Sequence, residues 1–223
     1  MGAGIETGID LDELAARAAE FEHAPAGKVI SWAVSRFGDA VSLACSFQDC
    51  VIVDLAVAVA PQIEVLFLDT GFHFPETLAY VEEVRARYHL NLRVVTPGPD
   101  AEAWPCGSQR CCQVRKVEPL YRALETRQAW LTGLKRSDAP TRAAAPIVSL
   151  DEHGLVKINP VATWTDDDIA HFEVDHGLPV HPLMSQGYLS IGCAPTTRPV
   201  APGEDPRAGR WSGTDKTECG LHG

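Results

Sequence analysis

A cysteine near the carboxyl end of the chain has the surroundings of a nucleophile. Cys219 lies close to Lys216 and His222 in the sequence, and only four residues follow it. Nearby cations favour a thiolate over a thiol, and a terminal segment moves unless something holds it. Glu218 acts in the opposite direction. We therefore predict that Cys219 is a nucleophile on a swinging arm, with an ordinary surface thiol as the alternative.

Three more cysteines have a spacing that suits a metal centre. Cys111 and Cys112 are adjacent, and Cys193 follows much later in the chain. Adjacent cysteines rarely bond to each other because the ring would be strained, and on a helix they point about 100° apart. Four thiolates would indicate zinc or an iron–sulfur cluster, but the position three residues after Cys193 holds Thr196. The alternative is a set of buried cysteines without a metal.

Three segments have the composition of a nucleotide site. Residues 46–49 leave a predicted strand and enter a helix, whose first N–H groups can bind an anion. Asp69 ends the next strand, where it can bind a ribose or base edge, and Lys135 and Arg136 follow a third strand. Each segment alone has an ordinary turn or helix cap as its alternative. Because ligands bind at the carboxyl ends of strands in open parallel sheets, the three together favour a nucleotide site.

The elements that must position these residues alternate between strands and helices. The apolar patterns predict strands at residues 40–47, 64–69, 91–96 and 129–134, and a hairpin-like pair at 147–150 and 155–158. They predict helices at residues 10–22 (capped by Asp10), 49–59, 75–89, 111–124 and 166–176 (capped by Thr165). This alternation predicts an α/β fold with a mostly parallel sheet flanked by helices.

The composition after Pro195 shifts to proline, glycine and arginine, which is typical of an irregular, mobile segment. We therefore divide the chain into a nucleotide-binding α/β domain over residues 1–200 and a flexible tail over residues 201–223 that carries Cys219.

Bulk composition excludes several classes of protein. The 223 residues are 45% hydrophobic, which is enough for one sizeable domain, and the net charge of −11 argues against nonspecific binding to nucleic acid or anionic membranes. The first ten residues lack the basic and apolar regions of a secretion signal, and the most apolar stretch, 51–60, is too short to span a bilayer. We expect a cytoplasmic protein, in which cysteines serve metal or redox chemistry more often than disulfides.

Taken together, these motifs resemble those of the assimilatory adenylyl-sulfate reductases of bacteria, within the family that includes the phosphoadenylyl-sulfate reductases. The resemblance covers nearly the whole chain from about Ala40, and the paired cysteines and the terminal motif are its most specific parts. The matching residues are 46–48, 68–78, 111–112, 115–116, 133–136, 141–142, 157–160, 164–165, 187–193, 207–211 and 216–222.

The resemblance implies an adenine-nucleotide α-hydrolase-like fold and the reduction of adenosine 5′-phosphosulfate (APS) to sulfite and AMP in sulfate assimilation. Matched by position, Cys219 is the implied nucleophile, forming an S-sulfonate, with His222 beside it. The implied substrate-binding residues are Ser46, Phe47, Gln48 and Asp69 around the nucleotide, and Lys116, Lys135, Arg136, Arg207 and Arg210 around the phosphosulfate. Thioredoxin is the implied electron donor and partner. Neither nucleic acid nor a membrane is expected as a partner, and a homo-oligomer stays open.

Cys111, Cys112 and Cys193 match three ligands of a [4Fe-4S] cluster, but Thr196 departs from the Cys-x-x-Cys pattern of the family. A neutral hydroxyl is a poor partner for iron beside sulfide and thiolate ligands. We therefore expect a cluster that is incomplete or labile. Four outcomes stay open: a water or hydroxide on one iron, a three-iron form, Cys106 as a substitute ligand, or no cluster.

Two other functions also stay open. One is a cluster-free reductase of the 3′-phosphorylated substrate (PAPS), and the other is a nucleotide- or metal-binding module without catalysis. The roles of Cys45, Cys50 and Cys106 are open as well, with burial as small hydrophobic residues as the default.

Overall fold

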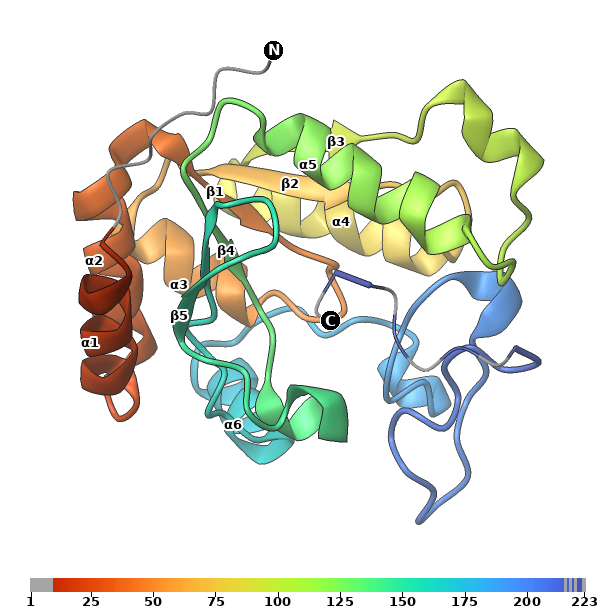
Figure 1. The fold of residues 1–223 in the computed structure, drawn as a ribbon. Coiled ribbons are helices and arrows are strands. Elements are labelled where there is room, and N and C mark those ends of the chain that lie inside the picture. The colour runs from red at the N-terminus through yellow and green to blue at the C-terminus, as the bar shows by residue number, and fades with distance from the viewer. Residues whose placement is uncertain (1–9, 215, 217, 219, 222–223) are drawn as a thin grey trace.

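The computed structural model describes residues 10–214, 216, 218 and 220–221. At its centre is a six-stranded sheet of order β3-β2-β1-β4-β6-β5 (Figure 1). The strands are β1 (Val41–Ala44), β2 (Glu64–Leu68), β3 (Asn91–Val95), β4 (Ala129–Thr132), β5 (Val148–Leu150) and β6 (Val156–Ile158). Every neighbouring pair is parallel except β5 and β6, which form an antiparallel pair at one edge. The prediction of a mostly parallel sheet with a terminal hairpin is confirmed.

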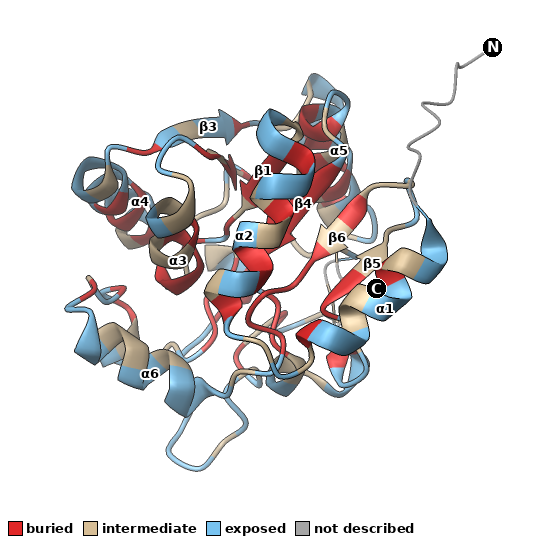
Figure 2. Ribbon diagram, turned by 90° about the vertical axis from the view of Figure 1, so that its left-hand side faces the viewer, coloured by how far each residue is buried: buried red, intermediate tan, exposed pale blue. Residues whose placement is uncertain are grey.

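Helices cover both faces of this sheet. They are α1 (Leu11–Phe21), α2 (Ala26–Phe37), α3 (Val51–Val59), α4 (Pro75–Tyr88), α5 (Glu118–Leu124) and α6 (Asp166–Asp175). Successive side chains of a strand point to opposite faces. Val65 and Leu131 accordingly join a large core with α1 to α4, whereas Leu66 and Trp130 join a smaller core with α5. Figure 2 shows the buried side of α2 turned toward β1 and β4.

Local signals explain most of the element boundaries. The Asp10 carboxylate accepts a hydrogen bond from the Asp12 amide at 2.9 Å, and Thr165 and Asp168 form a reciprocal capping box at the start of α6. Both caps were predicted. The helix expected over residues 111–124 is helical throughout, with a π-helical turn at Gln113–Val117 before α5. Pro119 contributes to this change of hydrogen-bond pattern because it has no backbone N–H to donate.

Helix α2 was not predicted. It begins after Pro25, whose side chain cannot cap a helix, so the usual start signal is missing. Its apolar residues nevertheless recur at helical spacing, and four of them, Val29, Ile30, Ala33 and Phe37, are buried.

The chain after Pro195 is irregular but hydrogen-bonded. Thr197 and Arg210 form an isolated antiparallel bridge, and the Arg198 amide donates to the Gly209 carbonyl at 3.0 Å. A Cβ at Gly209 would lie 2.1 Å from the Arg198 carbonyl oxygen, so this close approach requires glycine. These contacts hold residues 207–211 against the loop that carries Cys193. Among the residues that the structure describes, no helix is both long and apolar enough to cross a bilayer.

Candidate active site

A cavity of about 220 Å³ lies at the carboxyl ends of β1, β2 and β4. The loop after β1 contributes Ser46, Gln48 and Asp49, and the segment after β4 contributes residues 132–135. The irregular C-terminal segment closes the cavity with Arg207, Arg210 and Leu221. The cavity therefore lies where parallel α/β sheets bind ligands.

The loop after β1 is tightly constrained. Phe47 has a positive φ of 54°, and its amide donates to the Cys45 sulfur at 3.3 Å. The Gln48 side-chain Oε1 accepts a hydrogen bond from the Ile191 amide at 3.0 Å, which fastens the loop to the segment that leads to Cys193. The Asp49 carboxylate accepts from the Val51 amide at 3.1 Å and so uses the first turn of α3, and its burial raises its pKa.

Lys135 lies in the cavity wall within an acidic setting. Its ammonium contacts Asp166 and lies 3.4 Å from the Asp138 carboxylate. Burial disfavours the charged form of Lys135, but Asp166, Asp138 and Asp49 outweigh it and raise the pKa of the lysine. Lys135 is therefore a permanently charged group with a fixed position.

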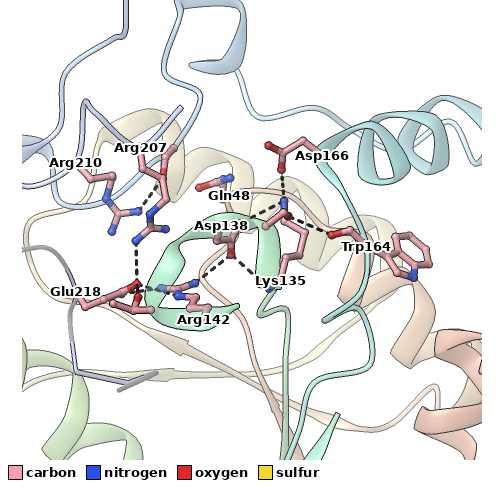
Figure 3. A network of polar contacts seen from close by, with 12 residues as sticks. Gln48, Lys135, Asp138, Arg142, Trp164, Asp166, Arg207, Arg210 and Glu218 are labelled. Carbon is pink, nitrogen blue, oxygen red and sulfur yellow. Dashed lines mark hydrogen bonds and ion pairs between the residues drawn. The ribbon is translucent and has the colours of Figure 1, made fainter. Parts of the chain in front are cut away.

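The C-terminal segment docks on the cavity through Glu218. Its carboxylate accepts from Arg142 Nε at 2.9 Å and from Arg142 Nη2 at 2.7 Å, and Arg207 lies 3.5 Å away (Figure 3). Arg142 also donates to Asp138 at 3.0 Å, so the arginine joins the tail to the segment after β4. Burial opposes ionisation of Glu218, but Arg142 and Arg207 outweigh it and lower its pKa.

A second anchor lies beyond position 219 in the sequence. Leu221 packs against the small core that contains Leu120 and Trp130, and its carbonyl oxygen accepts from Lys157 Nζ at 3.0 Å. Cys219 and His222 lie outside the described residues. Their neighbours Glu218 and Leu221 are both held at the edge of the cavity.

The Arg210 side chain contacts a hydroxyl, a carbonyl and an aromatic ring. It donates to the Ser190 hydroxyl at 3.2 Å and to the Ile191 carbonyl at 3.0 Å, and its guanidinium lies 4.6 Å from the centroid of the Trp211 ring. A Cβ at Gly192 would lie 2.6 Å from Arg210 Nε, so the arginine reaches this place only because residue 192 is glycine. These contacts orient the guanidinium in the wall of the cavity, where an arginine can bind the oxygens of an anion.

A smaller cavity, about 20 Å³, adjoins the first. Its walls contain four cysteines and a threonine, namely Cys106, Cys111, Cys112, Cys193 and Thr196. Lys116 and Arg210 line both cavities, so they form the wall that the two share. We call this second space the cysteine pocket.

Charge and hydrogen bonds act on the thiols of the cysteine pocket. A hydrogen bond with Cys106 lowers the pKa of Cys193 to about 4, with help from Lys116 and against the effect of burial. Lys216 Nζ lies 3.8 Å from the Cys112 sulfur. Within the described part of the chain, no group of three or more His, Cys, Asp or Glu side chains is arranged to hold a metal ion.

Comparison with known proteins identifies the family. A model of the phosphoadenosine phosphosulfate reductase domain matches residues 40–199. Adenosine 5′-phosphosulfate reductase of Mycolicibacterium smegmatis is 46% identical, with 96% of this chain and 95% of the relative covered. The Streptomyces coelicolor protein of the same name is 45% identical, with the same coverage of both chains. The chain belongs to the phosphoadenosine phosphosulfate reductase family.

Solved structures agree with this membership. Phosphoadenylyl-sulfate reductase from Candida auris, in a phosphate complex, superposes with a TM-score of 0.74 at 25% identity, covering 85% of this chain and 98% of that one. Candida glabrata FMN adenylyltransferase, in complex with FAD and pyrophosphate, has a TM-score of 0.62 at 16% identity, covers 86% of this chain and 68% of that one, and so shares the fold alone. The resemblance to a sulfur-directed oxidoreductase family and the predicted α/β fold are confirmed.

Most of the predicted substrate-binding residues of this reductase family member meet at the larger cavity. Those in its walls are Ser46, Gln48, Lys116, Lys135, Arg207 and Arg210. Three others have contacts that direct their side chains elsewhere. Phe47 packs edge-on against Phe67, the Asp69 carboxylate accepts from the Gly71 amide at 2.9 Å, and Arg136 pairs with Glu22, the residue that follows α1. The roles of all nine residues in binding a substrate stay predictions.

Sequence reasoning missed several residues that build the site. Arg142 was quoted as part of a matching motif but not as a site residue, and it is 7% exposed with Glu218 as its partner. Arg115 holds the loop after β2, because it donates to the Thr70 carbonyl at 2.9 Å and to the Ala101 carbonyl at 2.7 Å. A buried arginine and a surface arginine look alike in a sequence, so only the motif could have marked Arg142.

Proposed function

We propose that this protein reduces APS to sulfite and AMP in sulfate assimilation in the cytoplasm, with thioredoxin as the electron donor. The observation that carries the proposal is the docked tail. Glu218 and Leu221, on either side of Cys219 in sequence, are anchored at a cavity whose wall holds Arg207 and Arg210. The relatives that are 45–46% identical over nearly the whole chain bear the name of this activity.

The cavity suits a nucleotide that carries an anionic group at one end. Its inner part lies at the strand ends, where Ser46 and Gln48 offer polar groups to a base or ribose. Its outer part has Lys116, Arg207 and Arg210, which can bind phosphate and sulfate oxygens. A thiolate and an anionic substrate repel each other, so cations between them lower the barrier to attack.

The first chemical step is a nucleophilic substitution at sulfur. The Cys219 thiolate supplies an electron pair to the sulfate sulfur of APS, and a sulfur–sulfur bond forms. The bond from that sulfur to the bridging phosphate oxygen breaks, and its electron pair leaves with AMP. The enzyme then carries an S-sulfonate on Cys219.

The second step reduces the sulfonate. A thiolate of thioredoxin attacks the Cys219 sulfur, the sulfur–sulfur bond breaks, and sulfite leaves with that electron pair. The second thiol of thioredoxin resolves the mixed disulfide and frees Cys219. The dithiol of thioredoxin becomes a disulfide, so it supplies both electrons of the reduction.

The tail must serve both steps, since thioredoxin cannot enter a cavity of this size. Its anchors are two small sets of contacts, Arg142 with Glu218 and Lys157 with Leu221. Contacts of this size exchange faster than folding does. A docked tail shields the first step from water, and an undocked tail presents the sulfonate.

We further propose that the cysteine pocket holds a [4Fe-4S] cluster on Cys111, Cys112 and Cys193. The donor set supports this, because soft thiolates that share one pocket are what iron–sulfur clusters bind. When bound, the cluster would supply an electrostatic field that acts on Lys116 and Arg210 in the shared wall. It would not supply the electrons of the reaction. Those two side chains orient the phosphosulfate from that wall.

The test of the reaction is intact-protein mass spectrometry after anaerobic incubation with APS and no reductant. The wild-type chain should gain about 80 Da, the mass of one SO₃ group, and Cys219→Ser should gain nothing while still binding APS. Cys50→Ala is the matched control, since the Cys50 thiol is buried and faces the Pro179 carbonyl. It should form the adduct as the wild type does. A sulfonate on Cys219→Ser contradicts the proposed nucleophile.

A parallel assay with PAPS separates the two substrates of the family. We expect a higher kcat/KM for APS, because the relatives named for APS are 45–46% identical and the structure named for PAPS is 25% identical. A reversed preference would favour the cluster-free alternative.

A further inference from the structure

The fourth corner of the proposed cluster lacks a suitable donor at the expected position. Thr196 is 9% exposed, and its hydroxyl lies 3.5 Å from the Cys193 carbonyl oxygen as a hydrogen-bond donor. A neutral hydroxyl is a hard, weak donor for iron among sulfide and thiolate. Three thiols and this hydroxyl would therefore leave one iron poorly held.

Another thiol lies beside this hydroxyl. The Cys106 sulfur is 3.7 Å from Thr196 Oγ1, although the two residues are 90 positions apart in the sequence. Cys106 and Cys193 also line the same pocket. A sulfur thus lies next to the side-chain atom of the one position that departs from the family motif.

The loop that carries Cys106 forms a tight turn that lies close to Thr196. The Ser108 amide and hydroxyl both donate to the Pro105 carbonyl, at 3.1 and 2.7 Å, and close a turn around Cys106 and Gly107. Gly107 has a φ of +85°, and a Cβ there would lie 2.9 Å from Thr214 Cγ2 and 3.2 Å from Thr196 Cγ2. Only glycine allows the loop to approach Thr196 this closely.

The far side of the same loop leads to the other ligands. The Cys111 amide donates to the Ser108 carbonyl at 3.2 Å, and Lys216 Nζ contacts both that carbonyl, at 2.5 Å, and the Cys112 sulfur, at 3.8 Å. The turn, the paired cysteines and a cation are therefore one connected unit. A lysine beside the thiols offsets the negative charge that thiolate ligands bring.

We propose that Cys106 is the fourth thiolate ligand of the cluster, in place of the cysteine that the family motif has at position 196. The inference rests on the proposed cluster and deepens it, since it makes the cluster complete where Thr196 alone predicts an incomplete one. Cys106, Cys111, Cys112 and Cys193 would hold the cluster as thiolates, so their thiols would give up their protons when it binds.

Four thiolates can hold a four-iron cluster or a single zinc ion, and iron and sulfide analysis distinguishes the two. Four thiolates on one zinc lie about 3.8 Å apart, as bonds of about 2.3 Å in a tetrahedron require. Ligands of a four-iron cluster lie further apart, because each binds its own metal. Among the described residues, Cys106, Cys111, Cys112 and Cys193 line one pocket, which offers one thiol for each iron of such a cluster.

The experiment compares the iron and sulfide content of full-length proteins after anaerobic reconstitution. The proteins are the wild type, Cys106→Ser, the double variant Cys106→Ser with Thr196→Cys, and the control Cys50→Ala. We expect about four irons per chain in the wild type and the control, and about three or fewer in Cys106→Ser, with the electron paramagnetic resonance signal of a three-iron cluster after mild oxidation. The double variant should recover about four irons, because it restores the family position.

Each other result overturns the assignment. Cys106→Ser that keeps the iron content of the wild type, with the same rate of iron loss to a chelator, shows that Cys106 is not a ligand. Iron loss in Cys106→Ser without recovery in the double variant shows that the serine disturbed the pocket rather than removed a ligand. A wild type that binds no iron overturns the cluster and this assignment together. The sulfonate assay on Cys219 then still tests the reaction separately.

Discussion

The two cavities are adjacent, but they are built in different ways. The larger cavity, which we propose binds the nucleotide and call the nucleotide cavity, is shaped by the ends of β1, β2 and β4, so the sheet itself positions residues such as Ser46 and Lys135. The described residues that line the cysteine pocket belong to none of the six strands of the sheet. The pocket is assembled from the turn at Cys106, the π-helical region after Cys111 and the loop at Cys193.

Because of this difference, we expect the two cavities to respond differently to substitutions. A cavity at strand ends inherits its geometry from the whole core, and single changes at its rim alter contacts rather than shape. A pocket made of loops depends on a few close approaches, such as those of Gly107 and Thr196. Lys116 and Arg210 line both cavities, so they are the side chains through which we expect any coupling between the two.

The largest effect is expected from Arg142→Met, which breaks the rim of the nucleotide cavity. Arg142 and Glu218 are 7% and 14% exposed, so the change leaves a carboxylate without its partner in a poorly solvated place. Breaking such a pair costs about 3 kcal/mol, which corresponds to about a 100-fold slower rate of sulfonate formation. The rate is measured by rapid quench and mass spectrometry, and the iron content should stay as in the wild type.

Arg198→Met is the matched control for this change. The Arg198–Glu204 pair is 44% and 32% exposed, and exposed pairs contribute about 0–1 kcal/mol. We expect less than about a fivefold change in rate. Equal losses in both variants would show that charge, and not the docked tail, sets the rate.

The sequence indicated the first cavity far better than the second. Strands alternating with helices predict a parallel sheet, and the sheet alone brings residues 46–49 and Lys135 together. Nothing in the sequence gives the direction of a long side chain, so Arg136 was expected in the cavity although it pairs with Glu22. The contact between Cys106 and Thr196 depends on loop conformation over 90 residues of separation, which no local pattern encodes.

A middle-sized effect is expected from Gly107→Ala, which tests the cysteine pocket. The new Cβ would meet Thr214 at 2.9 Å and Thr196 at 3.2 Å, and the backbone has a φ of +85°. The strain of about 1–3 kcal/mol should move Cys106 away from Cys193 and lower the iron content after reconstitution about five- to tenfold. Nucleotide affinity, measured by calorimetry with AMP, should change less than about twofold.

Gly154→Ala separates backbone strain from the packing clash. Gly154 lies in the turn between β5 and β6 with a φ of +78°, and no atom lies within 4 Å of its Cβ position. It should reduce the unfolding free energy by about 1 kcal/mol and leave the iron content unchanged. A similar iron loss in both variants would mean that the pocket is sensitive to stability and not to the close approach of Gly107.

The smallest effect concerns the charges behind the nucleotide cavity and depends on pH. Burial raises the pKa of Glu173 to about 7, with a further contribution from Asp49 and an opposing one from Lys135. Between its ordinary pKa of 4.5 and about 7, the folded protein holds a proton that the unfolded chain releases, so this group lowers stability as pH rises through that window. Glu173→Gln should therefore raise the unfolding free energy by about 1 kcal/mol more at pH 8 than at pH 5, a value reduced for the solvent that reaches this half-buried side chain.

Urea denaturation at the two pH values measures the difference, and Glu83→Gln, on the exposed side of α4, is the control that should show none. If Glu173→Gln leaves the iron content unchanged, the charges behind the nucleotide cavity do not affect the cysteine pocket. If its gain in stability does not depend on pH, Glu173 acts through packing and not through its charge.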